Sequence, residues 1–118
     1  MFITLLKSKI HQAVITECNV DYEGSIEIDT ELIEAARMQV YEKVLIANVN
    51  NGERFDTYII PGPRGSRKIG LNGAAALRGK VGDRIIIFSF AMLEEDEVEG
   101  FSPTIIVLDE HNNVKVIK

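Results

Sequence analysis

The residues that could carry chemistry lie in four short groups of the 118-residue sequence. These groups are Tyr22-Glu23-Gly24-Ser25, Arg54, Thr57-Tyr58 and Asn72-Gly73-Ala74-Ala75-Ala76. A serine hydroxyl that follows glycine can attack the preceding peptide carbonyl when nearby donors stabilise the oxyanion. An arginine fork suits a planar carboxylate, and a tyrosine phenol can transfer a proton. Each group alone also has an ordinary explanation, because Gly24-Ser25 fits a simple turn and Asn72-Gly73 fits a helix start.

Motifs of other chemistries are missing from the sequence. It holds no glycine-rich phosphate loop, dinucleotide fingerprint, paired-histidine zinc motif or hydrolase serine elbow. One cysteine and two histidines are too few for a four-ligand zinc site, so we expect no metal. His11 is interpreted as a packing residue and Cys18 as a buried apolar thiol.

Composition predicts one folded domain over residues 1–118. Hydrophobic residues make up 46% of the chain and charged residues 26%, the usual balance of a folded protein. The net charge of -5 argues against a nucleic-acid or anionic-membrane partner. The single cysteine cannot form an internal disulfide, which predicts the reducing cytoplasm. The first residues show no apolar segment behind a basic start, so we expect neither export nor membrane insertion.

Runs rich in Val, Ile and Thr predict that these groups are positioned by short β-strands. The runs cover residues 2–9, 10–20, 25–29, 44–49, 54–60, 84–91, 104–108 and 114–117. One longer helix is expected from Thr30, its cap, with Leu32, Ile33, Ala36 and Val40 on one face. Asn51-Gly52 predicts a type I′ hairpin turn, and the prolines and glycines of residues 61–68 predict a loop. Many short strands with few helices indicate a compact β barrel or sandwich.

In combination, the residue groups and their spacing resemble the family of aspartate 1-decarboxylases, small pyruvoyl-dependent enzymes. The resemblance covers nearly the whole chain. It is carried by Lys9, His11, Tyr22-Glu23-Gly24-Ser25, Asn51-Gly52, Arg54, Thr57-Tyr58, Arg64-Gly65-Ser66, Asn72-Gly73-Ala74-Ala75-Ala76 and Val81-Gly82-Asp83.

The resemblance implies a mainly β fold, the double-psi β barrel, with one or two short helices. It implies a homotetramer whose active sites lie between neighbouring subunits. It further implies self-cleavage of a zymogen between Gly24 and Ser25, giving a β chain of residues 1–24 and an α chain of residues 25–118. The activity implied is decarboxylation of L-aspartate to β-alanine for pantothenate and coenzyme A biosynthesis. Whether cleavage needs a maturation protein stays open.

The same resemblance implies a role for each residue. Ser25 becomes the covalent pyruvoyl group, whose ketone forms a Schiff base with the substrate and acts as an electron sink. Tyr58 is the expected proton donor, and Thr57 and Asn72 are expected to assist processing. The expected substrate-binding residues are Arg54, Thr57, Gly73, Ala74, Ala75 and Lys9.

A noncatalytic β-barrel binding module is the alternative. In that case Gly24-Ser25 is only a turn, and the loop cations Arg64, Arg67 and Lys68 bind an anionic partner. The two interpretations predict different covalent structures. The enzyme is cut after Gly24, whereas the module stays one chain.

Overall fold

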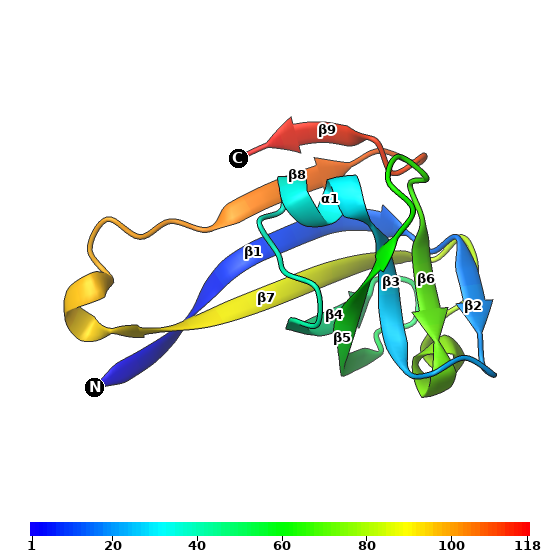
Figure 1. Ribbon diagram of the computed structural model, residues 1–118, viewed down its shortest axis with the longest axis horizontal. Coiled ribbons are helices and arrows are strands. Elements are labelled where there is room, and N and C mark those ends of the chain that lie inside the picture. The colour runs from blue at the N-terminus through cyan, green and yellow to red at the C-terminus, as the bar shows by residue number, and fades with distance from the viewer.

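The computed structural model describes residues 1–118 and consists mainly of strands (Figure 1). The elements are β1 (Phe2–Val14), β2 (Glu17–Asn19), β3 (Ser25–Asp29), α1 (Thr30–Ala35), β4 (Lys43–Asn48), β5 (Arg54–Gly62), β6 (Ile69–Asn72), η1 (Gly73–Arg78), β7 (Arg84–Glu94), η2 (Glu95–Glu97), β8 (Thr104–Leu108) and β9 (Val114–Ile117), where η marks a 3₁₀ helix. None of the helices has the length and apolar character needed to cross a membrane.

The nine strands form one mixed sheet in the order β2-β6-β3-β5-β4-β7-β1-β8-β9. β1 continues through Ile15 and Thr16 into β2, so the chain itself joins the two sides of the sheet. Backbone hydrogen bonds from Thr16 to Ile69 and from Gly82 to Ile15 hold this crossing. The arrangement is consistent with a small β barrel and confirms the mainly β fold predicted from the sequence.

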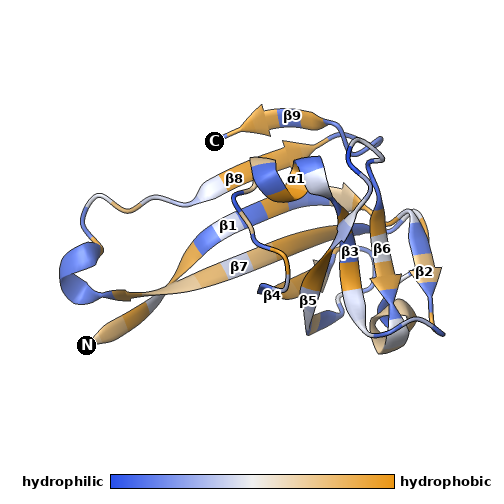
Figure 2. Cartoon of the chain, in the orientation of Figure 1, coloured by the Kyte–Doolittle hydropathy of each residue, from blue (hydrophilic) through white to orange (hydrophobic).

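Isoleucine fills the core. Ten isoleucines are fully buried, and they come from seven strands and from the segment after β1. They are Ile10, Ile15, Ile26, Ile28, Ile46, Ile59, Ile69, Ile85, Ile87 and Ile106. β-branched side chains suit the pleated surface of a strand, and their alternation sends one face of each strand inward. Figure 2 shows hydrophobic residues along the strands and hydrophilic ones in η2. The outward face is thereby left for other residues, among them Arg54 and Tyr58 of β5.

β1 and β7 extend beyond the barrel as a two-stranded ribbon (Figure 1). Phe2 to Leu6 pair with Phe90 to Glu94, whereas β4 and β8 contact these strands only nearer the barrel. Phe2, Phe90 and Met92 are exposed by 59%, 45% and 67% on this ribbon. The projecting ribbon therefore carries large apolar side chains that the chain itself does not cover.

The helix differs from the sequence prediction. Its cap is Asp29 rather than Thr30, because the Asp29 side chain accepts from the Glu31 backbone N–H. The Thr30 hydroxyl instead donates to the Gly62 carbonyl at 2.7 Å. α1 ends after six residues, and Arg37 then takes a left-handed φ of 57°, so Val40 lies outside the helix and is 40% exposed.

Two further predictions of local structure were wrong. The hairpin between β4 and β5 is present, but φ is positive at Gly52 and not at Asn51, which excludes a type I′ turn. Its loop is longer, with side-chain oxygens of Asn48 and Asn51 accepting backbone N–H bonds. β5 continues through Pro61 and Gly62, because β3 is its only strand neighbour there and an edge tolerates a residue without an N–H.

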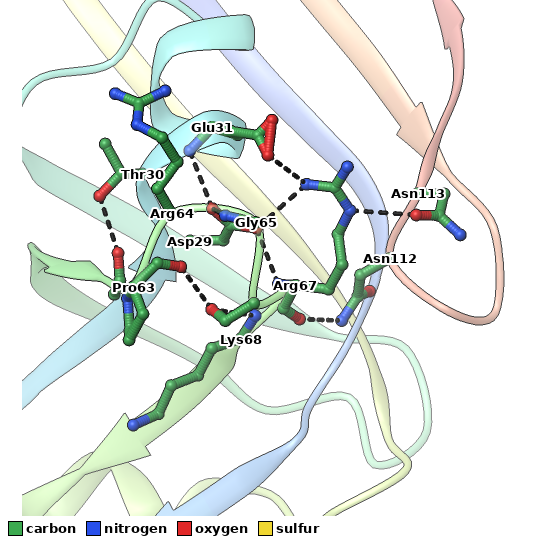
Figure 3. A network of polar contacts seen from close by, with 12 residues as sticks. Asp29, Thr30, Glu31, Pro63, Arg64, Gly65, Arg67, Lys68, Asn112 and Asn113 are labelled. Atoms are coloured by element: carbon green, nitrogen blue, oxygen red, sulfur yellow. Dashed lines mark hydrogen bonds and ion pairs between the residues drawn. The ribbon is translucent and has the colours of Figure 1, made fainter.

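The buried Asp29 carboxylate ties α1 to the loop between β5 and β6 (Figure 3). It accepts four hydrogen bonds at 2.7–3.0 Å, from the backbone of Glu31, Gly65 and Arg67 and from the Arg67 guanidinium. Arg67 also donates to Asn113 of the turn between β8 and β9. Burial alone raises the pKa of the Asp29 carboxyl, but these hydrogen bonds outweigh burial and hold the pKa below its ordinary value.

Replacing Asp29 tests this network. We expect Asp29→Asn to lower the free energy of unfolding by about 3 kcal/mol at pH 7, because an amide cannot accept from all four donors. The carboxylate stabilises the fold above its unfolded pKa, near 3.8, and this stabilisation is lost as the pH falls through the lower folded value. Denaturation at several pH values should therefore show a smaller loss of stability below pH 4 in the variant than in the parent.

The exposed Asp96 supplies a matched control, since its replacement by Asn changes the same charge without a buried partner. Equal effects of Asp29→Asn and Asp96→Asn on stability would contradict the role given to the network.

Candidate active site

The Gly24–Ser25 peptide bond lies where an exposed turn enters the sheet. Gly24 is exposed, and Ser25, the first residue of β3, is only 1% exposed. Ser25 is the register partner of Asn72, the last residue of β6. The bond therefore joins a surface segment to a strand end that the antiparallel β3–β6 pair holds in place.

The Ser25 hydroxyl has two hydrogen-bond partners. Its Oγ donates to the Glu23 carbonyl at 3.3 Å and accepts from Asn72 Nδ2 at 3.0 Å. Asn72 precedes η1 but makes no side-chain cap bond there, because its amide turns toward Ser25. Asn72 is therefore a site residue rather than the helix cap that its sequence context also allowed.

Gly73 packs directly against the backbone of Gly24. A Cβ on Gly73 would lie 2.7 Å from the Gly24 Cα and 3.0 Å from the Tyr22 carbonyl oxygen, and Gly73 has a φ of +67°. Both the contact and the conformation require glycine at position 73. Gly24 has no positive φ and open space around its own Cβ direction, so the steric requirement lies at Gly73 rather than at Gly24.

A cavity of about 360 Å³ opens beside this contact. Residues 54–58 of β5 pair only with β4, because the pairing of β5 with β3 begins at Ile59. The other edge of this half of β5 faces the start of η1 across the cavity. The lining residues are Gly24, Phe55, Asp56, Thr57, Tyr58, Ala74, Ala75 and Arg78. Five of the predicted site residues thus meet in one cavity, with Ser25, Asn72 and Gly73 adjoining it in the chain.

Lys9 and Arg54 do not line this cavity. They lie on the outward face of the sheet beside the Phe88 ring, at 5.9 Å and 5.8 Å from its centroid. Neither cation forms an ion pair within the chain. Within one copy of the chain, the two predicted carboxylate-binding cations are therefore not part of the cavity beside the Gly24–Ser25 bond.

The loop cations of the binding-module alternative all have partners inside the chain. Arg64 makes two hydrogen bonds to the Glu34 carboxylate, at 3.0 and 2.7 Å. Arg67 pairs with Asp29 and Glu31, and Lys68 lies between Glu17 and Glu27. The loop consequently presents little uncompensated positive charge to an anionic partner.

Cys18 and His11 have the surroundings of packing residues. Cys18 is half-buried, with its thiol 3.6 Å from the Gly79 carbonyl oxygen, and burial together with the nearby Asp83 charge raises its pKa. His11 is also half-buried, and burial followed by the charges of Lys9 and Lys118 lowers its pKa. A thiolate nucleophile at Cys18 is disfavoured by this shift.

Sequence reasoning missed three residues that line the cavity and one beside the cations. Asp56 could have been found, since strand alternation places it on the same face as Arg54 and Tyr58. Phe55 and Arg78 reach the cavity only through the packing of η1 against the free half of β5. Phe88 lies in a run of apolar residues, and nothing in that run distinguishes it from a core residue.

Comparison with known proteins matches residues 1–115 to the family described as aspartate decarboxylase. The chain belongs to the aspartate decarboxylase family. It is 59% identical over 118 residues to the aspartate 1-decarboxylase of Coprothermobacter proteolyticus, covering 100% of this chain and 97% of the relative. The aspartate 1-decarboxylases of Chlorobium chlorochromatii and Carboxydothermus hydrogenoformans are 55% and 49% identical, covering 98% and 100% of this chain and 89% and 93% of theirs. The family resemblance drawn from the residue groups is thereby confirmed.

The contact between Gly73 and Gly24 in this family member can be tested by stability. We expect Gly73→Ala to lower the free energy of unfolding by about 3 kcal/mol, the sum of a left-handed alanine and a collision with backbone. Gly52→Ala is the matched control, because Gly52 has a φ of +76° and nothing within 4 Å of its Cβ direction. We expect Gly52→Ala to lower the free energy of unfolding by about 1 kcal/mol. Equal losses in urea denaturation of the two variants would mean that the contact is unimportant.

Proposed function

We propose that this chain is a self-processing carbon–carbon lyase that converts L-aspartate to CO2 and β-alanine. The β-alanine is used in pantothenate biosynthesis. The observation that carries the proposal is the Ser25 hydroxyl held by Asn72, next to a Gly24 backbone that borders the cavity with Thr57 and Tyr58. The names of the relatives, aspartate 1-decarboxylase, supply the substrate and reaction class.

Self-cleavage begins at the Ser25 hydroxyl. Its Oγ attacks the Gly24 carbonyl carbon, the C–N bond breaks, and the hydroxyl proton ends on the freed amine. Removal of the Ser25 α-proton then expels the Gly24 carboxylate with the ester electron pair and leaves dehydroalanine at position 25. Water hydrolyses this group with release of ammonia, which leaves a pyruvoyl group on the chain of residues 25–118. Thr57 is the proposed donor to the developing oxyanion, with Asn72 holding Oγ.

The surroundings of position 25 fit a pyruvoyl group. The Asn72 amide already donates to the side chain of this residue, and Gly73, which has no side chain, packs directly against the Gly24 backbone. Main-chain groups of Gly73, Ala74 and Ala75 approach without bulky side chains and would hold the group and the substrate. A pyruvoyl group supplies a ketone for the substrate nitrogen and a conjugated carbonyl that takes up the electron pair left by departing CO2.

Tyr58 is the proposed proton donor in turnover. It lines the same cavity as Gly24 and is 38% exposed, so its phenol can reach a bound molecule. The carbon that loses CO2 needs one proton, and the phenol can supply it. Its neighbour Thr57 lines the cavity too and is the proposed substrate contact beside the cleavage bond.

Lys9 and Arg54 are proposed to bind a substrate carboxylate across a subunit boundary. Aspartate carries two carboxylates, and the chain has a net charge of -5, so the substrate needs local cations. The two cations are unpaired but lie away from the cavity of their own chain. A homotetramer with sites between neighbours is therefore part of the proposal, and the exposed apolar side chains of the projecting ribbon support such an assembly.

Cytoplasmic location is also proposed, in keeping with the single free cysteine.

The binding-module alternative is not favoured. Its predicted anion-binding loop has each cation engaged by carboxylates of the same chain. The cavity lies instead beside Gly24, at the proposed cleavage bond.

Cleavage is tested first by the denatured mass of the purified protein. We expect two pieces, residues 1–24 and 25–118, the larger one lighter by one ammonia than simple hydrolysis predicts. Ser25→Ala should stay whole and release no CO2 from L-aspartate. Retained activity in Ser25→Ala would sink the mechanism, as would a parent chain that stays whole after incubation with an extract of its source cells, which supplies any maturation protein.

A second glycine-serine pair gives the control for cleavage. Ser66 follows Gly65, is exposed and bonds to the Pro63 carbonyl at 2.6 Å, with no asparagine amide on its hydroxyl. Ser66→Ala should therefore be cut after Gly24 like the parent, and no cut is expected after Gly65.

Tyr58 is tested by separating processing from turnover. We expect Tyr58→Phe to be cut normally, because the phenol is not bonded to Ser25, and to show kcat lower by about 10²-fold to 10⁴-fold. The exposed Tyr41, changed to Phe, should leave kcat at the parent value. Normal turnover in Tyr58→Phe would remove this residue from the donor role.

A further inference from the structure

One aromatic ring contacts two cations of the outer sheet face, Lys9 and Arg54, that have no carboxylate partner. Lys9 on β1 is directly opposite Phe88 on β7 in the strand register. Arg54 comes from β5, two strands away from β7. Its register partner on the intervening β4 is Ala47, whose methyl group leaves room for the guanidinium to reach over β4. Three strands thus bring two cations and one ring together.

The ring attracts both cations without neutralising them. The face of a benzene ring carries partial negative charge and holds Lys or Arg at the distances seen here, 5.9 and 5.8 Å. Two other strand cations are held by carboxylates, Lys7 by Glu42 at 2.8 Å and Lys43 by Asp56 at 3.9 Å. A carboxylate partner would compete with an incoming anion, whereas a ring leaves the positive charge available.

The plane of the Phe88 ring is itself supported. Phe90 stacks on it with centroids 6.4 Å apart and an angle of 12° between the planes. Phe88 is half-buried, and its neighbour on β4 is Leu45. Phe90 lies further along the same strand and face, where no cation contacts its ring. The pair therefore combines one ring that touches cations with one that does not.

We propose that Phe88 is a positioning residue that holds Lys9 and Arg54, without a counter-ion, in the arrangement that binds a carboxylate of the dicarboxylate substrate. The inference rests on the proposed function, which supplies the identity of the substrate. Phe88 itself needs no contact with the reacting atoms. The predicted signature is a change in substrate binding with processing and chemistry preserved.

The test compares three variants of the full chain. We expect Phe88→Leu to be cut normally and to raise KM for L-aspartate about tenfold, with kcat within about twofold of the parent. Phe88→Tyr keeps a ring and should restore KM to within about twofold. Phe101→Leu removes a ring of the same size that contacts no cation and should leave KM near the parent value. A parent-like KM in Phe88→Leu, or an equal rise in Phe101→Leu, would overturn the proposal.

Succinate binding separates this inference from the proposed function. Succinate is a dicarboxylate without an amino group, so calorimetry of its binding needs no reaction. We expect Phe88→Leu to weaken succinate binding about tenfold relative to the parent, and Phe88→Met serves the same purpose if the leucine variant does not fold. Weaker succinate binding in Phe88→Leu than in the parent, together with a parent that releases no CO2, would leave the inference standing and refute the decarboxylase. Unchanged succinate affinity would refute the inference alone.

Discussion

The approach of the Gly73 backbone to Gly24 sets the geometry of everything around the proposed cleavage bond. Antiparallel pairing of β3 with β6 brings Ser25 opposite Asn72, and the chain then turns at Gly73 with a positive φ. This turn directs η1 over the free half of β5 and so forms one wall of the cavity. Because a side chain at position 73 would meet backbone atoms, the contact cannot be kept by rotating a neighbouring side chain.

Strand identity was readable from the sequence because the core depends on β-branched residues at alternate positions, as in Val44 and Ile46 of β4. The choice between neighbouring residues that could both cap the helix was harder to predict. Asp29 and Thr30 are both good caps, and only the position of the loop between β5 and β6 decides that Asp29 takes the role. β6 was missed because its four residues follow a loop rich in glycine and charge, and its pairing with β2 and β3 is entirely long-range.

Family resemblance predicted the residues of the site and its position between subunits, but not which of these residues line the cavity of one chain. Residue types and spacing point to Arg54, Thr57 and Tyr58 together, since they lie within one strand. Strand register and the packing of η1 then place Tyr58 at the cavity and leave Arg54 on the outer face beside Phe88. Register is a property of the paired strands, so no inspection of a single segment could have found this division.

The position of residues 1–24 in the sheet changes what a cut after Gly24 does to folding. β1 lies between β7 and β8, and β2 pairs with β6, so every strand neighbour of the smaller piece belongs to the larger one. After a cut, folding becomes an association of two polypeptides, and its equilibrium acquires a dependence on protein concentration. The smaller piece would act as a tightly bound structural ligand, and dilution in denaturant would separate the two pieces, unlike the single uncut chain.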